Sequence, residues 1–374
     1  MNYPLERYGR QMLLNGFGEQ GQRKLFNASV LVIGAGGLGC PVLQYLAVAG
    51  VGTIGIVDDD IVSLTNLHRQ VLYTEKDLGL NKVDIAINKL QAINSEIIVK
   101  GYVVHLTNQN ALDLFKNFDL IIDGTDNFFS RYIINDACVL LGKPLIYGAI
   151  SQFEGHIAVF NVRLNENQYS SNYRDLFPEP PVVGTVLNCA QAGVIGVLPG
   201  IIGSLQANEA IKLITGIGKP LINSLFSYNS LTNETYQFDI SSRKNTDTLI
   251  PTDAAAYTLF DYDGFCGTAA ELAEEIDVAT FEKLLNTGSA EVIDVREKGE
   301  LPIANGFQKI PLSQLKEKIP NLKGEIIVVF CQTGSRSQQA AKLLSSTFGP
   351  SKKIYSLTGG ILAWKTYKDG KQQA

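Results

Sequence analysis

The sequence lacks the features that mark membrane proteins and nucleic-acid-binding proteins. No apolar run among its 374 residues approaches the ~18 residues that span a bilayer, and the residues after Met1, NYPLERYGR, are polar. The net charge is −5 and no long block of one sign occurs, whereas nucleic-acid binders usually carry a basic face. We therefore expect a cytoplasmic protein that binds neither membranes nor nucleic acid.

Cysteine is also scarce, and its spacing argues against a disulfide framework. The chain has five cysteines, far apart and without a C-x-x-C pair: Cys40, Cys138, Cys189, Cys266 and Cys331. In a reducing compartment these residues are free thiols. Cys40 and Cys138 fall inside helical patterns and are expected in the core, because free cysteine is commonly buried.

What the sequence does have is a repeated alternation of strands and helices. Buried strands are expected at residues 28–34, 51–60, 97–106, 119–127 and 144–150, with helices between most of them. This order predicts an α/β fold with a doubly wound, mostly parallel sheet. Two further segments, 152–162 and 224–240, have the pattern of antiparallel additions.

A change in composition divides the chain. Residues 246–274 show no sustained periodicity and are interpreted as a linker after a first domain over 1–245. The alternation then restarts on a smaller scale, which predicts a second α/β domain over 275–374. The total length agrees with two domains, at roughly 150 residues each.

The stretch GAGGLG, residues 34–39, follows an expected strand and opens an expected helix. Glycines at Gly34, Gly36, Gly37 and Gly39 would let the backbone approach a phosphate at the helix amino terminus. The same turn also serves close helix–strand packing in proteins that bind no nucleotide. Asp58 follows the next strand, where a carboxylate can accept hydrogen bonds from the ribose of NAD or of ATP.

The residues after that carboxylate favour ATP. Asn66, Arg69 and Gln70 share one loop, and Lys82 lies at the start of the next helix. Cations beside the phosphates suit a site that cleaves ATP, because they neutralise charge on the departing pyrophosphate, whereas hydride transfer has no evident use for them. Asp126, at the carboxyl end of another strand, is placed to bind a magnesium ion.

Two cysteines are candidate nucleophiles. Cys331 and Arg336 bound a loop between an expected strand, EIIVVF, and an expected helix. The backbone N–H groups of such a loop form an anion nest that stabilises a thiolate or a persulfide. Cys189 precedes another expected helix, whose amino terminus would lower its pKa, although a buried structural cysteine is an equal interpretation from position alone.

Six motifs in order resemble the MoeB/ThiF/HesA adenylyltransferases, relatives of ubiquitin-activating enzymes: RYGRQ, GAGGLG, DDDIVSLTNLHRQ, NKVD, DGTDN and NCAQAGVIGVLPG. The resemblance covers about residues 5–240 and implies a Rossmann-like sheet that binds ATP and Mg²⁺. It implies adenylation of the carboxyl-terminal glycine of a small ubiquitin-like sulfur carrier protein. By motif, the glycines and Asp58 hold the nucleotide, while Asn66, Arg69 and Lys82 face the phosphates. Arg10 would reach into the partner's site of a homodimer, and Asp126 would bind magnesium.

The stretch holding Cys189 matches a family segment whose cysteine forms a thioester or disulfide with the carrier. Over about residues 275–370, DVRE, CQTGSR and SLTGGILAW resemble rhodanese sulfurtransferases. That resemblance implies a persulfide on Cys331, supported by Arg336 and loaded by an upstream donor such as a cysteine desulfurase.

The resemblance also raises a metal question, because MoeB-like proteins usually have two C-x-x-C pairs for structural zinc. This chain has SNYRD at 171–175 and DGFCG at 263–267 in their place. One thiol cannot close a site that needs four ligands, and the three histidines (His68, His105, His156) are not spaced to substitute. We therefore expect no zinc site, so that either packing holds the crossing loop or the loop is mobile.

Two other classes of function remain open. A nicotinamide-dependent oxidoreductase with an accessory domain would use the glycine-rich turn for NAD. A non-catalytic adaptor would use the second domain only to dock partners.

Overall fold

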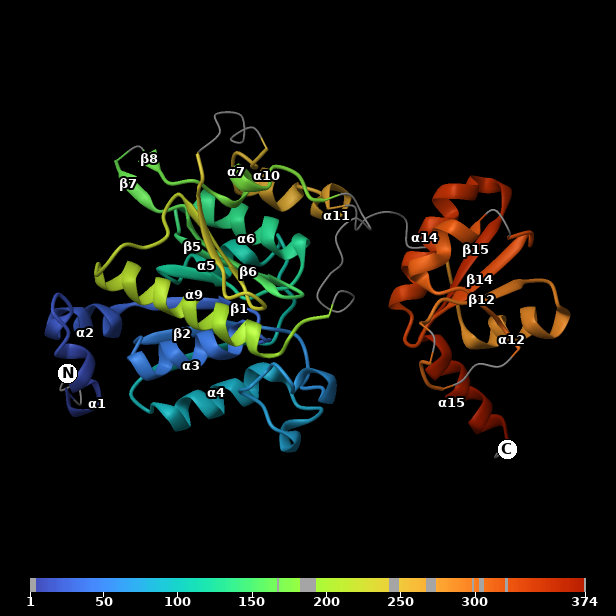
Figure 1. Ribbon diagram of the computed structural model, residues 1–374, viewed down its shortest axis with the longest axis horizontal. Helices are drawn as coiled ribbons and strands as arrows, with labels where there is room; N and C mark the ends of the chain where they lie inside the picture. Colours follow the sequence, from blue (N-terminus) through green and yellow to red (C-terminus); the bar gives the residue numbers. More distant parts are fainter. Residues whose placement is uncertain are drawn as a thin grey trace. The chain divides into compact units, whose positions relative to one another are not determined.

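The computed structural model of the chain is shown in Figure 1. It describes residues 5–166, 168–181, 193–241, 249–266, 274–297, 299–302, 306–319 and 322–372. The chain divides into two compact units, Met1–Thr268 and Ala269–Ala374, and each is described by itself.

The first unit contains an eight-stranded sheet in the order β10-β9-β6-β5-β4-β1-β2-β3. The parallel strands are β1 (Ser29–Ile33), β2 (Thr53–Val57), β3 (Ile98–Tyr102), β4 (Leu120–Asp123) and β5 (Leu145–Ser151). Strands β6 (Glu154–Phe160), β9 (Ser224–Asn229) and β10 (Thr235–Asp239) extend it antiparallel. The predicted fold class is confirmed. The order reverses between β1 and β4, which is where doubly wound sheets bind ligands.

Helices cover both faces of this sheet, as Figure 1 shows. One apolar core joins the sheet to α2 (Gly18–Asn27), α3 (Gly39–Ala49), α4 (Lys82–Ile93) and α9 (Val197–Thr215). The opposite core involves α5 (Ala111–Phe115) and α6 (Phe128–Leu141). Burial on two faces explains why the central strands are continuous apolar runs rather than alternating ones.

The region expected to be a linker differs from the prediction. It contains α10 (Ala254–Leu259) and α11 (Tyr262–Phe265), which pack on α6 within the first unit. Tyr257 of α10 is fully buried, and its hydroxyl donates to the carbonyl of Ile133 at 3.0 Å. Helices of six and four residues are too short to show a periodic pattern in sequence.

Several other short elements also lack a clear sequence signal. The amino-terminal residues form two helices, α1 (Leu5–Met12) and α2. A small hairpin of β7 (Arg163–Asn165) and β8 (Gln168–Tyr169) precedes α7 (Tyr173–Leu176).

None of the described helices has the length and apolar character needed to cross a bilayer.

The second unit has a five-stranded parallel sheet in the order β11-β15-β14-β12-β13. Its strands are β11 (Glu275–Ile276), β12 (Glu291–Asp294), β13 (Gln308–Lys309), β14 (Ile326–Phe330) and β15 (Lys353–Leu357). One face packs against α13 (Leu315–Lys318) and α14 (Ser335–Phe348), and the other against α12 (Val278–Thr287) and α15 (Gly360–Gln372). Cys331 follows β14 directly, so it lies at the carboxyl edge of the sheet.

Four of the five cysteines fall in the described residues, where all four are buried and none forms a disulfide: Cys40, Cys138, Cys266 and Cys331. Cys40 and Cys138 are fully buried in the two cores of the first unit, as expected. Burial raises the pKa of Cys40 to about 12, so this thiol stays protonated. Cys189 lies outside the described residues.

Candidate active sites

A cleft opens at the carboxyl ends of β1, β2 and β4 in the first unit. Its lining includes nearly all of the residues that the sequence nominates for nucleotide binding: Gly34, Gly36, Gly37, Asp58, Asn66, Arg69, Gln70, Lys82 and Asp126. Gly39 is not part of this lining. Arg10 lies on α1 with an exposed side chain and does not line the cleft of its own chain.

The glycine-rich turn is built by a close approach of backbone to backbone. Gly34 has a φ of +91°, a conformation that L side chains rarely adopt. A Cβ on Gly39 would lie 1.9 Å from the carbonyl oxygen of Gly34, so only glycine fits there. Gly39 therefore allows the close packing of the turn without lining the cleft, while Gly36 and Gly37 line the cleft just before α3.

Asp58 ties the second strand to the glycine-rich turn. Its Oδ2 accepts a hydrogen bond from the backbone N–H of Ala35 at 2.7 Å, and its Oδ1 accepts one from Asp60 at 2.9 Å. Burial raises the pKa of this carboxyl, although Lys82 and the two N–H donors oppose the shift. Each carboxylate oxygen has a second lone pair, so the group can still accept bonds from a ligand hydroxyl.

The two cations of the cleft are held by neighbouring oxygen atoms. The Nζ of Lys82 bonds to Oδ2 of Asp60 at 2.7 Å; Lys82 is only 3% exposed, whereas Asp60 is 69% exposed. The guanidinium of Arg69 donates to Oδ1 of Asn66 at 2.9 Å and contacts the ring of His68. A buried ammonium beside an exposed carboxylate can exchange that partner for a phosphate oxygen without leaving its position.

One polar atom in the lining has no partner among the described residues. Gln70 is 4% exposed, and its Oε1 is buried without a hydrogen bond in the part of the chain that is described. Such an atom is costly unless a ligand or water binds it, so the lining fits a polar occupant such as a nucleotide. Sequence reasoning missed further lining residues, among them Val104, His105 and Ser130.

Asp126 lies in the turn between β4 and α6, which is fixed by hydrogen bonds of neighbouring residues. Asp123, at the end of β4, is buried and accepts hydrogen bonds from the N–H and the hydroxyl of Thr125. Asn127 caps α6 by accepting the N–H of Ser130 at 2.8 Å. These bonds fix the turn and leave the exposed carboxylate of Asp126 directed to the cleft lining.

A buried ion pair ties the first of the segments that replace the zinc-binding pairs to α6, and the second segment packs against the same arginine. Arg174 of α7 makes a bidentate contact with Asp136 of α6, at 2.8 and 2.7 Å, and both side chains have 0% exposure. The hydroxyl of Tyr262 donates to the same carboxylate at 2.8 Å, and the Arg174 guanidinium lies 4.6 Å from the centre of the Phe265 ring. Among the described residues of these two segments Cys266 is the single thiol, and Arg174 is a buried cation, so they do not offer the four ligands of a tetrahedral zinc site.

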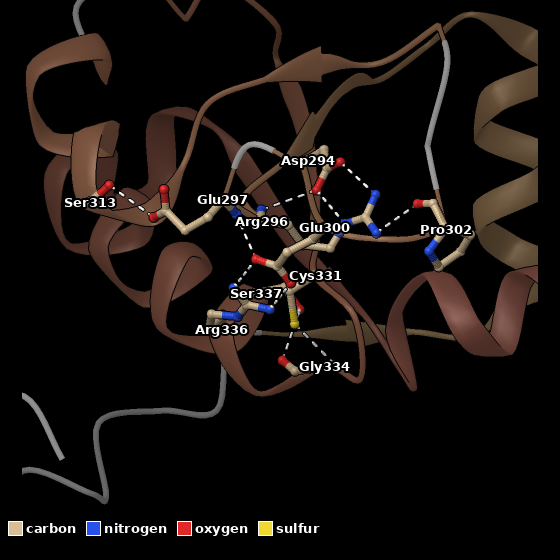
Figure 2. Close-up of polar contacts among 10 residues, drawn as sticks. All are labelled: Asp294, Arg296, Glu297, Glu300, Pro302, Ser313, Cys331, Gly334, Arg336 and Ser337. Atoms are coloured by element: carbon tan, nitrogen blue, oxygen red, sulfur yellow. Dashed lines mark hydrogen bonds and ion pairs between the residues drawn. The ribbon is translucent and has the colours of Figure 1, made fainter. Parts of the chain in front are cut away.

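The second site surrounds Cys331 in the second unit, and Figure 2 shows its polar contacts. The thiol is 1% exposed, and Sγ accepts the backbone N–H of Gly334 at 3.2 Å. Burial raises the pKa of Cys331, but N–H donors of the loop and the hydroxyl of Ser337 outweigh it and hold the pKa below its usual range. This loop therefore favours the nucleophilic thiolate, as the sequence predicts.

Two buried serines, which sequence reasoning missed, form a chain of hydroxyls behind the thiol. The hydroxyl of Ser356 on β15 donates to Oγ of Ser337 at 2.9 Å. Ser337 in turn lies 3.7 Å from Sγ of Cys331 and 2.8 Å from the carbonyl oxygen of Gly334. Both serines have 0% exposure. Ser356 opens the SLTGGILAW motif, but the motif does not reveal its contact with Ser337, which lies 19 residues away.

Arg336 does not point a free guanidinium at the thiol. Its NH1 and NH2 donate to the two carboxylate oxygens of Glu300, each at 2.6 Å. Sequence reasoning missed Glu300, which lies outside the quoted motifs. Arg296 of the DVRE stretch, fully buried, bonds in the same bidentate way to Asp294.

The sequence matches two protein families. Residues 8–250 match the ThiF family, and residues 277–367 match the rhodanese-like domain. The chain is 42% identical over 372 residues to "Probable adenylyltransferase/sulfurtransferase MoeZ" of Mycobacterium tuberculosis, with 96% of this chain and 92% of that protein covered. It is 36% identical over 395 residues to "Adenylyltransferase and sulfurtransferase MOCS3" of Xenopus laevis, covering 97% and 86%.

A shorter relative and a solved structure each match about two thirds of the chain. "Sulfur carrier protein adenylyltransferase" of Thermus thermophilus is 50% identical over 264 residues, which are 70% of this chain and 97% of that protein. A crystal structure of E. coli MccB with MccA-N7isoASN has a TM-score of 0.56 at 24% identity, covering 65% of this chain and 74% of that one, and it supports the fold alone. The chain is a member of the ThiF family with a carboxyl-terminal rhodanese-like domain, and it is an ATP-using adenylyltransferase and sulfurtransferase.

Proposed function

We propose that the protein adenylates the carboxyl-terminal glycine of a ubiquitin-like sulfur carrier protein and then converts that carboxylate to a thiocarboxylate. The supporting observation is that a glycine-rich turn, two cations and the exposed carboxylate of Asp126 line one cleft. The printed name of the Thermus thermophilus relative refers to a sulfur carrier protein. An oxidoreductase would instead need a flat slot for a nicotinamide ring.

In this proposal the cleft residues orient ATP for in-line attack. The carrier carboxylate attacks the α-phosphorus, pyrophosphate leaves, and an acyl-adenylate forms. Lys82 and Arg69 balance the charge that develops on pyrophosphate, and Asn66 holds Arg69 in place through its hydrogen bond. The backbone around Gly36 and Gly37 faces the phosphates, and Asp58 accepts hydrogen bonds from the ribose hydroxyls. Gln70 offers the nucleotide a buried acceptor, since its Oε1 has no partner among the described residues.

Asp126 is the residue that would hold magnesium. Its carboxylate is exposed in the cleft, which suits Mg²⁺, because this ion takes one or two protein carboxylates and completes its shell with phosphate oxygens and water. The ion would offset the negative charge of the triphosphate. Zinc has no part in the proposal, since the buried Arg174–Asp136 pair stands where its ligands would be needed.

The sulfur step uses Cys331 as a persulfide carrier. Its terminal sulfur attacks the acyl carbon, AMP leaves, and the carrier becomes joined to Cys331 through an acyl disulfide. Cys189, outside the described residues, then attacks the Cys331 sulfur and frees the thiocarboxylate, or it first forms a thioester itself. Fusion of the two activities in one chain raises the effective concentration of persulfide near the activated carbonyl.

The remaining parts of the proposal concern partners and location. The exposed side chain of Arg10 on α1 would complete the nucleotide site of a second copy in a homodimer. A cysteine desulfurase would supply the persulfide sulfur. The setting would be the cytoplasm, where thiols stay reduced.

The test is exchange of labelled pyrophosphate into ATP in the presence of the carrier. The Asp126→Ala variant should lose the exchange. Asp113→Ala is a matched control, because Asp113 is an exposed carboxylate that pairs with Lys116 and does not line the cleft. Exchange that survives in Asp126→Ala would refute the magnesium assignment, and exchange without any carrier would refute the proposed substrate.

A further inference from the structure

The guanidinium beside the reactive thiol is already occupied. Arg336 follows the loop of Cys331, and its two terminal nitrogens donate to Oε1 and Oε2 of Glu300, both at 2.6 Å. The pair is partly exposed, with Arg336 at 29% and Glu300 at 24%. The paired edge of the guanidinium is the edge that a bound oxyanion would need, because a bidentate carboxylate and a tetrahedral oxyanion use the same two N–H directions.

Glu300 is held in this position by its own segment. Its Oε1 also accepts the backbone N–H of Glu297 at 2.7 Å. The chain just beyond it is anchored by Arg296, which donates to the carbonyl oxygen of Pro302 at 2.9 Å. Arg296 is in turn fixed by its bidentate contact with Asp294. Figure 2 shows two sets of contacts, one among Asp294, Arg296 and Pro302 and the other among Glu297, Glu300 and Arg336. The carboxylate is thus pre-positioned on Arg336 rather than drawn there from solvent.

The charged network that ends at Arg336 is consequently unfavourable for a multiply charged anion. The groups of this network are three carboxylates (Asp294, Glu297, Glu300) and two guanidiniums (Arg296, Arg336), so their sum is −1 before the Cys331 thiolate is counted. Arg336 also lowers the pKa of Glu300, which therefore stays ionised at neutral pH. A dianion that binds Arg336 would have to displace Glu300 and approach a network whose charges already sum to −1.

We infer that Glu300 is a specificity-determining residue, which makes Cys331 accept sulfur from persulfides and reject small dianionic donors such as thiosulfate. The inference rests on the proposed function of Cys331 as a persulfide carrier. A persulfide needs no guanidinium fork, because its leaving group is a thiolate rather than a sulfur oxyanion.

The two loading reactions differ in this respect. With a persulfide, the Cys331 thiolate attacks the outer sulfur of R–S–SH, the donor S–S bond breaks, R–S⁻ leaves, and Cys331–S–SH keeps the proton. With thiosulfate, the thiolate attacks the outer sulfur, the S–S bond breaks, and sulfite leaves as a dianion while Cys331–S–S⁻ remains. Only the second reaction builds charge on oxygen atoms that Arg336 would have to bind.

The experiment compares two donors on the full chain: thiosulfate, and the persulfide prepared from 2-mercaptoethanol. Loading is measured as the mass gain of one sulfur atom on the Cys331 peptide, and as thiocyanate formed with cyanide. Glu300→Gln frees the guanidinium from a charged partner with little change of shape. Glu297→Gln is the matched control, because it removes the same charge three positions before Glu300, from a side chain that accepts a hydrogen bond from Ser313 at 2.9 Å.

We expect Glu300→Gln to raise kcat/KM for thiosulfate by about tenfold, mainly through a lower KM, which corresponds to ~1.4 kcal/mol. Loading from the persulfide should change less than about twofold, which also shows that the variant is folded. Glu297→Gln should leave the thiosulfate KM near that of the unaltered protein. Adding Arg336→Ala to Glu300→Gln should remove the gain.

Each other result has a distinct meaning. If Glu300→Gln leaves the thiosulfate KM unchanged, or raises loading from both donors equally, the specificity role of Glu300 is refuted while the persulfide function stands. An equal gain in Glu297→Gln would refute the role of the fork. If neither donor loads Cys331 in the unaltered protein, the proposed function fails and this inference fails with it.

Discussion

The hydroxyl of Ser337 provides a direct test of how the thiolate of Cys331 is stabilised. Ser337→Ala removes this hydroxyl but keeps the backbone N–H that also lowers the pKa of Cys331. The substitution fills the same buried space less one oxygen atom, so it perturbs packing little. We expect the pKa of Cys331 to rise, because one of the donors that oppose the effect of burial is gone.

The magnitude follows from the geometry. A hydrogen bond to a charged group is worth ~1.5–3 kcal/mol, and one pKa unit corresponds to ~1.4 kcal/mol, which together bound the shift at about one to two units. Ser337 has a single proton, which is placed between the carbonyl of Gly334 at 2.8 Å and Sγ at 3.7 Å. Sharing between two acceptors and a long contact favour the lower bound, about one unit. Donation from Ser356 strengthens Ser337 as a donor, so Ser356→Ala should give a smaller shift.

The assay is the rate at which iodoacetamide alkylates the Cys331 peptide as pH is raised, read by mass spectrometry. The midpoint should move to higher pH in Ser337→Ala, because only the thiolate reacts and a raised pKa delays its appearance. Thr347→Ala is the control, since its hydroxyl lies on the same helix and donates to the carbonyl of Leu343. An unchanged midpoint in Ser337→Ala would mean that the hydroxyl of Ser337 donates only to the carbonyl of Gly334, and the proposed stabilisation of the thiolate would be wrong.

Three further outcomes are expected. Lys82→Gln should slow pyrophosphate exchange by about a hundredfold with ATP binding weakened much less, because the cation acts mainly on charge that develops during the reaction; equal losses in binding and rate would contradict this. Arg174→Met should lower the free energy of unfolding of the first unit by ~3–5 kcal/mol in urea titrations, since Asp136 would be left buried and unpaired; combining it with Asp136→Leu should recover most of the loss, and no recovery would count against the pair. A strong zinc chelator should leave the melting temperature unchanged, and a fall would reveal a metal that the buried pair argues against.

The overall fold was accessible from sequence because it depends on long, regular signals. Strands such as Ser29–Ile33 and Leu120–Asp123 are buried on both faces and appear as unbroken apolar runs. The helices that cover them are long enough to show helical periodicity. The sequence predicts a linker where the structure has the short helices of Tyr257 and Tyr262. These helices are held by contacts with α6 that no local pattern reveals.

The sites were accessible to different degrees. Lining residues that lie in compact motifs, such as Asp58 and Lys82, come together in the cleft because parallel strands end at one edge. The contacts of Glu300 and Ser356 could not be identified in this way, because each residue lies far along the chain from the group that it contacts. The interaction of Arg174 with Asp136, across 38 residues, has the same origin. Long-range side-chain pairing is set by packing and leaves no local trace in the sequence.

The most direct test of the whole account is the mass of the carrier after a single incubation with ATP and a persulfide donor. The unaltered protein should replace one carboxylate oxygen of the carrier by sulfur. Cys331→Ala should stop at the acyl-adenylate while pyrophosphate exchange continues at its normal rate. Thiocarboxylate formed equally well by Cys331→Ala, or exchange lost in that variant, would contradict the claim that one unit activates the carboxylate and Cys331 of the other delivers the sulfur.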